Sequence, residues 1–276
     1  MPTLYTAHTP LYTATGGQGS TRLVAAWGRT QNKSLPPVIE CGGWPGTGAW
    51  NPAIGVWSRK ALTAAGYTVI TVWTGANWGH PTGSSAPSSG PTGTGTTAIS
   101  DARTWAGSIL GLQNSVVHIY GTSMGGTNAA AWAAANPSLV GGVYMMSPAL
   151  SLLHIWDLSG TAIPGGGTYP NYASSMASAY GTTPGDRAAF STASQSIDPV
   201  RNTASFSGIG SHISIFAARD DDVIGWSNCA SFASATGATL TASAPEGEPG
   251  GGHITPNLQA AYNEFDALQL FDSFNP

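Results

Sequence analysis

The residues of this 276-residue chain that could do chemistry together are a serine, a group of aspartates and a histidine, in that order. Ser123 is the centre of a G-x-S-x-G motif, three consecutive aspartates occupy positions 220–222, and His253 follows three glycines. A serine hydroxyl is a poor nucleophile at neutral pH, so it needs a base to take its proton and an acid to orient that base. The sequence therefore predicts Ser123 as a nucleophile and His253 as its base.

The acid must be one of the three adjacent aspartates. A small residue at position 218, two further residues and then Asp-x-Val-Ile is the spacing that favours Asp221. Asp220 and Asp222 stay open as alternatives, because the geometry of the turn cannot be derived from the sequence. Neighbouring carboxylates repel one another, so the three are not all buried. We expect the two that do not orient the histidine to be solvated or to cap the following turn.

The other five histidines are expected to be structural or to lie on the surface. One lies within an apolar segment, one begins another such segment, one is close to the N-terminus, and two lie in segments that could line a site. In chain order they are His8, His80, His118, His154 and His212.

The elements around Ser123 are those that could present a reactive hydroxyl. Residues 116–120 (VVHIY) have the composition of a buried strand, and the alanine-rich run 128–135 has high helix propensity and ends before Pro137. A G-x-S-x-G motif alone is weak evidence in a chain with 37 glycines. The strand before it and the helix after it predict a nucleophile elbow, in which the serine lies at a strained strand-to-helix turn.

A tetrahedral intermediate at Ser123 would need two N–H donors for its oxyanion. The first is expected to be the backbone N–H of Met124, the residue after the nucleophile. The second is expected from the loop 42–46 (GGWPG), which follows the apolar strand 38–41. We favour Trp44 as this donor, with Gly43 as the alternative.

Apolar strands and helical segments alternate along most of the chain, which favours a parallel sheet with helices on both faces. The segment before residue 30 contains short strands with turns, with 16–19 as a loop, and indicates an antiparallel entry to the sheet. The expected strands are 4–7, 11–14, 23–27, 38–41, 67–73, 116–120, 142–146, 212–218 and 239–243, and the expected helices are 54–65, 97–110, 128–135, 227–236 and 256–271.

Two segments interrupt this alternation. Residues 74–97 are a loop rich in Gly, Ser, Pro and Thr that contains Trp78 and His80, and long internal loops are commonly functional. Residues 149–205 are irregular and contain five aromatic side chains and Met176 among Gly, Pro and Ser. We interpret this second segment as a lid or cap inserted over the carboxyl edge of the sheet, the alternative being a surface excursion packed onto the fold.

Several of these motifs resemble the α/β-hydrolase superfamily, most closely its esterase branch. The resemblance is carried by residues 121–126 (GTSMGG) and 142–150 (GVYMMSPAL), and extends from about residue 36 to the end of the chain. The loop 42–46 is similar to the family's His-Gly-x-x-Gly oxyanion loop, although Gly42 stands where the family has histidine. The resemblance implies a mostly parallel sheet flanked by helices, a single domain over 1–276, the chain order Ser, Asp, His, and no metal or organic cofactor.

The amino-acid composition limits the classes of partner that the protein could bind. Charged residues are 8% of the chain, far below the usual quarter, and the nine basic residues are scattered with a net charge of −4, which argues against nucleic acid. No apolar run approaches the length of a membrane span, and no signal peptide is visible at the N-terminus. The location stays open between the cytoplasm and an extracellular or virus-particle setting. Oligomeric state or membership of a larger assembly also stays open.

Together these features predict a serine hydrolase that cleaves carboxylic esters, including lipid esters, through an acyl-enzyme. The aromatic and nearly uncharged segment 149–205 favours an apolar or lipid-like acyl group. An acyltransferase or a peptidase would use the same acyl-enzyme. A non-catalytic module on this fold, carried on a virus particle or a cell surface, is the alternative from another class.

Overall fold

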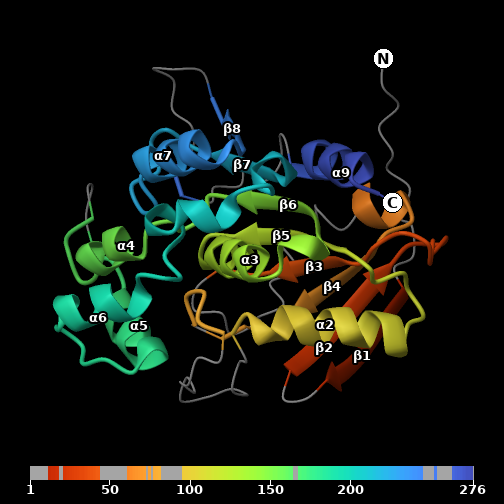
Figure 1. The fold of residues 1–276 in the computed structure, drawn as a ribbon, viewed down its shortest axis with the longest axis horizontal. Helices are drawn as coiled ribbons and strands as arrows, with labels where there is room; N and C mark the ends of the chain where they lie inside the picture. The colour runs from red at the N-terminus through yellow and green to blue at the C-terminus, as the bar shows by residue number, and fades with distance from the viewer. Residues whose placement is uncertain are drawn as a thin grey trace.

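The computed structural model describes residues 12–18, 21–43, 61–72, 74–75, 77–81, 95–163, 167–244, 252–253 and 263–275. Its centre is an eight-stranded sheet with the strand order β1-β2-β4-β3-β5-β6-β7-β8 (Figure 1). The strands are β1 (Tyr12–Gln18), β2 (Thr21–Trp27), β3 (Val38–Cys41), β4 (Thr68–Val72), β5 (Val117–Thr122), β6 (Val140–Met146), β7 (Ile213–Ala217) and β8 (Thr239–Ala242).

The pairing within the sheet is mostly parallel, as expected. β1 pairs with β2 and β2 with β4 in antiparallel fashion, and the remaining neighbours from β4 to β8 are parallel. Residues 16–18, predicted as loop, instead continue β1 and pair with residues 21–23 of β2. Their glycines are unfavourable in a strand, but the ladder to β2 outweighs this local preference. The predicted strand 4–7 lies outside the described residues.

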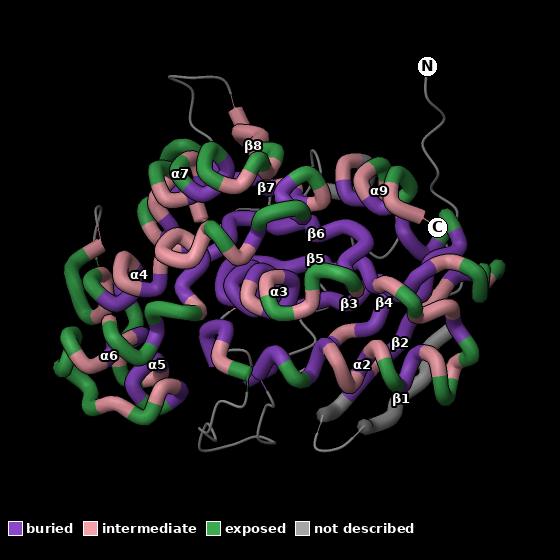
Figure 2. The backbone as a smooth tube through the Cα atoms, in the orientation of Figure 1, coloured by how far each residue is buried: buried purple, intermediate pink, exposed green. Residues whose placement is uncertain are grey.

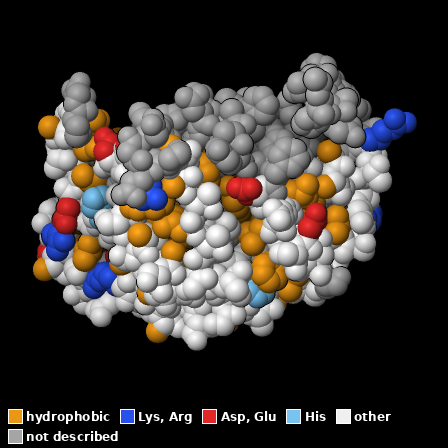
Figure 3. All heavy atoms as spheres, turned by 90° about the horizontal axis from the view of Figure 1, so that it is seen from above, with side chains coloured by type: hydrophobic (Ala, Val, Ile, Leu, Met, Phe, Trp, Pro, Cys, Tyr) orange, Lys and Arg blue, Asp and Glu red, His pale blue; other side chains and the backbone are white. Residues whose placement is uncertain are grey.

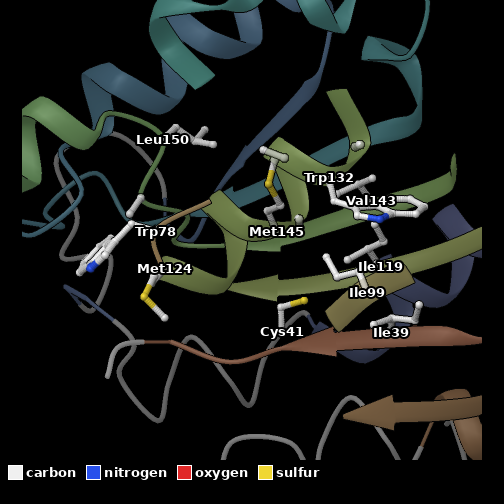
Figure 4. Close-up of a cluster of buried hydrophobic side chains, with 14 of the residues drawn as sticks. Ile39, Cys41, Trp78, Ile99, Ile119, Met124, Trp132, Val143, Met145 and Leu150 are labelled. Atoms are coloured by element: carbon white, nitrogen blue, oxygen red, sulfur yellow. The ribbon is translucent and has the colours of Figure 1, made fainter. Parts of the chain in front are cut away.

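The centre of the sheet is a row of β-branched side chains in register. Ile70, Ile39, Ile119, Val143 and Ile213 lie side by side on five adjacent strands, and each is fully buried. Three members of this row, with Ile99 and Trp132 of the flanking helices, are visible in the close-up of the core (Figure 4). Because every residue of β3, β5 and β6 is buried, the apolar composition of these strands reflects burial on both faces.

Helices cover both faces of the sheet. The side chains of α2, α3 and α7 belong to one buried cluster, whereas α9 and the helical residues 61–64 contribute to a second cluster that includes Tyr67, Tyr144 and Phe216. The bounds are α2 (Thr97–Ser108), α3 (Met124–Ala135), α7 (Trp226–Thr236) and α9 (Asn263–Ser273). Residues 54–60 and 256–262, predicted as parts of helices, lie outside the described residues.

The segment 149–205 is more regular than predicted. Three short helices, α4 (Leu152–Leu158), α5 (Tyr172–Tyr180) and α6 (Arg187–Ser194), lie together at one end of the molecule (Figure 1). Each begins after a side chain that accepts a backbone N–H three residues later, namely Ser151, Asn171 and Asp186. These capping residues are the sequence signal for the three helices, and the high Gly and Pro content of the segment obscured it. The lid role of the segment stays a prediction.

Short 3-10 turns complete the described chain at Pro137–Leu139, Pro199–Arg201, Thr203–Phe206 and Gly210–His212. Figure 2 shows that burial is concentrated in the central strands and in α3. Residues 124–130 of α3 are all buried, which places the helix after Ser123 in the interior rather than on the surface.

Candidate active site

Ser123 lies at a strained turn between β5 and α3. Its backbone has φ 53° and ψ −119°, a conformation rarely adopted by a residue with a side chain. The surrounding backbone fixes this turn, because the Ser123 N–H donates to the carbonyl of Met146 at 3.0 Å and the Ser123 carbonyl accepts from Gly126 and Ala149. Strain of this kind persists only where neighbouring contacts determine it, and it is concentrated at functional sites.

The glycines around Ser123 are required by close approaches. A Cβ at Gly121 would lie 2.7 Å from the carbonyl oxygen of Gly125, and one at Gly125 would lie 2.0 Å from that of Cys41. A Cβ at Gly126 would lie 2.4 Å from the Cβ of Pro148. Only hydrogen fits at these positions, so the glycine pattern follows from the packing of α3 against β3, β5 and the end of β6.

The structure brings Ser123, His253 and Asp221 into one hydrogen-bonded chain. The Oγ of Ser123 lies 3.0 Å from the Nε2 of His253, and the His253 Nδ1 lies 2.9 Å from one carboxylate oxygen of Asp221 and 3.1 Å from the other. A carboxylate can only accept here, so Nδ1 carries the proton and Nε2 is free to accept from the serine hydroxyl. Their catalytic roles stay predictions, but their positions are those that the predicted roles require.

Asp221 is held by the turn that follows β7. Its side chain is fully buried, and its Oδ1 accepts the backbone N–H groups of Val223 and Ile224, each at 3.0 Å. Its own N–H donates to the carbonyl of Ala218. The carboxylate is therefore oriented by two backbone donors before it meets the imidazole, which leaves it little freedom to rotate.

The two neighbouring aspartates are exposed and have different partners. The Oδ1 of Asp220 accepts the N–H of Gly252, the residue before His253, at 3.1 Å. The Oδ2 of Asp222 accepts the hydroxyl of Tyr169 at 2.9 Å. Neither of these bonds was predicted, because the partner residues are far away in the sequence and no local pattern marks them.

The described part of the loop after β3 lies against the serine. A Cβ built on Gly43 would be 3.3 Å from the Cβ of Ser123 and 3.9 Å from its Oγ, so the backbone of Gly43 borders the reactive hydroxyl. Met124 is the first residue of α3, as expected for the first oxyanion donor. Trp44, the favoured second donor, lies outside the described residues.

The remaining described histidines are not part of this hydrogen-bonded chain. His118 is fully buried in β5, where its Nδ1 accepts the N–H of Gly142 at 2.9 Å, and burial lowers its pKa to about 4. The Nδ1 of His212 lies 2.7 Å from the carbonyl of Gly141. The ring of His80 packs edge-on against Tyr180, and burial lowers the pKa of His80.

His154 lies in α4. Its Nε2 is buried and has no hydrogen-bond partner among the described residues. A Cβ on Gly225 would approach that atom to 3.1 Å, so this ring faces the segment after Ile224. His8 lies outside the described residues.

The segment after β4 is joined to the helix that follows Ser123. The N–H of Gly79 donates to the side chain of Asn128 in α3 at 2.6 Å, and the Asn128 amide donates to Thr74 at 3.0 Å. Trp78, between these contacts, adopts φ 49° and is buried. The aromatic residue in a polar loop was the sequence signal for this segment, but its contact with α3 was not predicted.

A family model with the description "alpha/beta hydrolase fold" matches residues 36–186, which is more than half of the chain. The chain belongs to the α/β-hydrolase family. Among solved structures, this α/β-hydrolase is similar to esterase Est22, with a TM-score of 0.63 and 17% identity over 98% of this chain and 81% of that one.

Two further solved structures have the same fold as this α/β-hydrolase. They are carboxyl esterase 2 from the mycorrhizal fungus Tuber melanosporum (TM-score 0.63, 13% identity, 98% and 90% of the two chains) and Est1E from Butyrivibrio proteoclasticus (TM-score 0.60, 13% identity, 95% and 96%). At such low identities the likeness establishes the fold. No curated protein matches this α/β-hydrolase at a significant level of sequence similarity.

Two negative observations apply to the described part of this α/β-hydrolase. Among those residues, no group of three or more His, Cys, Asp or Glu side chains is arranged to hold a metal ion. None of the helices found there combines the length and apolar character needed to cross a bilayer.

Proposed function

We propose that the protein is a serine hydrolase that cleaves carboxylic esters, with Ser123 as nucleophile, His253 as general base and Asp221 as the acid that orients it. The observation that carries this proposal is the continuous hydrogen-bonded chain from the Ser123 Oγ through both ring nitrogens of His253 to Asp221. The strained turn at Ser123 adds support, because it projects the hydroxyl away from strand and helix alike.

In the first half of the reaction, the Ser123 Oγ attacks the ester carbonyl carbon while the Nε2 of His253 takes the hydroxyl proton. Asp221 keeps the imidazole in the required tautomer and stabilises the positive charge that forms on it. The carbonyl electron pair moves onto the oxygen, which the backbone N–H of Met124 stabilises together with an N–H from the loop after β3. We assign this second donor to Trp44, with Gly43 as the alternative.

Collapse of the intermediate breaks the bond to the alcohol oxygen, which receives the proton from Nε2. The acyl group stays on Ser123 as an ester. Water then attacks this acyl-enzyme while His253 again accepts a proton, and return of that proton to Oγ releases the carboxylic acid. These steps need no other group than the named side chains and backbone donors.

An apolar acyl group is the substrate class that the surroundings of the site favour. Trp78, Met124 and Leu150 belong to one buried hydrophobic cluster next to the elbow (Figure 4). Among the described residues, most of the surface drawn in Figure 3 carries no charged side chain, in line with the 8% of charged residues in the chain. A charged acyl group would lose hydration against these apolar side chains.

The test is hydrolysis of p-nitrophenyl esters by the wild-type protein and by Ser123→Ala. We expect butyrate and longer acyl chains to be cleaved faster than the charged hemisuccinate, and Ser123→Ala to be slower by about 10³-fold or more. Ser207→Ala, which alters an exposed serine, is the matched control. Equal rates for wild type and Ser123→Ala would refute the proposal, and faster cleavage of the charged ester would refute the preference for apolar acyl groups.

A further inference from the structure

A tyrosine of the segment 149–205 contacts the turn that carries Asp221. The Tyr169 hydroxyl donates to the Oδ2 of Asp222 at 2.9 Å and also lies 3.4 Å from the Asp222 backbone carbonyl. Tyr169 is only 5% exposed, although Asp222 is exposed. A buried side chain from one segment is therefore hydrogen-bonded to the residue directly after Asp221, 53 positions further along the chain.

Tyr169 is itself held in a defined place. Its N–H donates to the carbonyl of Thr161 at 2.9 Å, and Ala162 and Thr168 form an antiparallel bridge beside it. Burial, followed by the bond to Asp222, raises the pKa of Tyr169 to about 12. The phenol thus keeps its proton at neutral pH and acts as the donor to the carboxylate.

Helix α5 of the segment is anchored to the chain after β4. The indole N–H of Trp78 donates to Ser175 of α5 at 2.9 Å, and the hydroxyl of Tyr180 donates to the Trp78 carbonyl at 2.7 Å. Trp78 lies next to Gly79, which is bonded to α3 through Asn128. The segment is therefore tied both to the turn of Asp221 and, through the chain after β4, to the helix that begins at Ser123.

The turn that carries Asp221 is small, so the hydrogen bond between Tyr169 and Asp222 can affect the position of the Asp221 carboxylate. Asp221 accepts from Val223 and Ile224 and donates to Ala218, so residues 218–224 form one compact turn in which the exposed Asp222 directly follows Asp221. A shift of Asp222 rotates the backbone on which the carboxylate of Asp221 is mounted. Hydrogen-bond geometry at a catalytic base is sensitive to displacements of less than an ångström.

We propose that Tyr169 is a positioning residue that acts through Asp222 to fix the carboxylate of Asp221 against His253. This inference rests on the proposed function for the roles of Asp221 and His253. It assigns to the segment 149–205 a task besides its predicted lid role, namely to hold the acid of the site in place.

The variants are Tyr169→Phe, which removes the hydroxyl, Asp222→Ala, which removes the acceptor, and the double variant. We expect each single change to lower kcat on the order of tenfold, with KM within twofold of wild type. The double variant should be no slower than either single one, because both remove the same bond. Asp222→Asn keeps an acceptor oxygen and should restore most of the rate.

The matched control is Tyr67→Phe. Tyr67 also donates its hydroxyl to a carboxylate, that of Asp272 at 2.7 Å, but it packs with α9 on the other face of the sheet. This variant should lose stability and keep the wild-type kcat. A kcat of Tyr169→Phe within twofold of wild type, or an equal loss in Tyr67→Phe, would overturn the inference while leaving the activity of the wild type and the inactivity of Ser123→Ala intact.

A second readout does not depend on ester cleavage. The Nδ1 proton of His253, hydrogen-bonded to Asp221, should give a resonance far downfield in the proton NMR spectrum of the wild-type protein. We expect this resonance to shift or broaden in Tyr169→Phe and Asp222→Ala and to stay unchanged in Tyr67→Phe. An unchanged resonance in all three would overturn the inference, whatever the protein does to esters.

Discussion

At the scale of single residues, three adjacent carboxylates of the same type have three different partners. Asp220 bonds the backbone next to His253, Asp221 bonds the imidazole, and Asp222 bonds Tyr169. Only Asp221 is buried. The difference comes from the turn, which directs Asp221 inward and its two neighbours outward, so similar side chains in one sequence run are not interchangeable.

This arrangement predicts that the same Asp→Asn substitution has different effects on kcat at two neighbouring positions. Asp221→Asn removes the charge that stabilises the protonated imidazole and permits the wrong tautomer, so kcat should fall by about 10³- to 10⁴-fold. Asp220→Asn keeps an oxygen that can accept from Gly252, so kcat should stay within about threefold of wild type. Steady-state kinetics of both variants, with circular dichroism to verify folding, provide the measurement. A loss in Asp220→Asn as large as that in Asp221→Asn would transfer the role of the acid to Asp220.

At the scale of elements, the contact between α3 and the end of β3 sets the geometry of the elbow. The helix approaches so closely that a Cβ on Gly125 would overlap the backbone of Cys41 and lie 2.7 Å from the carbonyl oxygen of Gly42. Backbone atoms cannot move aside by changing rotamer. The position of Ser123 beside Gly43 therefore depends on the absence of a side chain two residues after the serine.

Gly125→Ala should accordingly destabilise the fold by about 3 kcal/mol or more, because the backbone atoms around the added methyl group cannot move away without disrupting the packing of α3 against β3. The midpoint and slope of urea unfolding measure this. Ala131→Gly in the same helix is the control, and at its half-buried position it should cost about 1 kcal/mol. A Gly125→Ala protein with the unfolding midpoint of the wild type would contradict the close approach described here.

The elements could largely be predicted from the sequence, because burial imposes a local pattern. The apolar runs of β3, β5, β6 and β7 and the alanine-rich α3 each reflect their own environment. Local pattern gave the wrong prediction for residues 16–18, where the pairing with β2 outweighs the low strand preference of glycine. It also failed for α4 to α6, whose start signals are single capping residues within a stretch rich in Gly and Pro.

The candidate site could likewise be predicted only in part. Ser123, Asp221 and His253 could be proposed because strand order and turn motifs bring certain loops to one edge of a parallel sheet. The bonds of Tyr169 to Asp222 and of Gly79 to Asn128 could not, because each joins residues about 50 positions apart and depends on how two segments pack. Tertiary hydrogen bonds of this kind have no periodicity in the sequence.

At the scale of the whole molecule, two buried ionisable groups give the stability opposing dependences on pH. Burial lowers the pKa of His118 to about 4 from about 6.5 in an unfolded chain, so its contribution is present above pH 6.5 and is lost as the pH falls towards 4. Burial raises the pKa of Asp198 to about 6 from about 3.9, so the native state is penalised above pH 6 and relieved as the pH falls.

Single variants should separate these two contributions. His118→Asn removes the titrating ring, so between pH 6.5 and 4 its unfolding free energy should fall less steeply with decreasing pH than that of the wild type. Asp198→Asn removes the opposing group, so its unfolding free energy should fall more steeply with decreasing pH than that of the wild type. Urea unfolding at half-unit pH steps measures the slopes. Parallel curves for the wild type and His118→Asn would contradict a neutral, buried imidazole in β5.

The two cysteines of the chain, Cys41 and Cys229, have a practical consequence. Both are free thiols in the interior, and burial raises the pKa of each, so neither presents a reactive thiolate to solvent. Ile109, at the end of α2, is by contrast 67% exposed. A cysteine introduced there would be the one thiol within reach of a maleimide, so the protein could be attached to a bead or a dye through a single covalent bond in one orientation, with its own sulfur atoms left untouched.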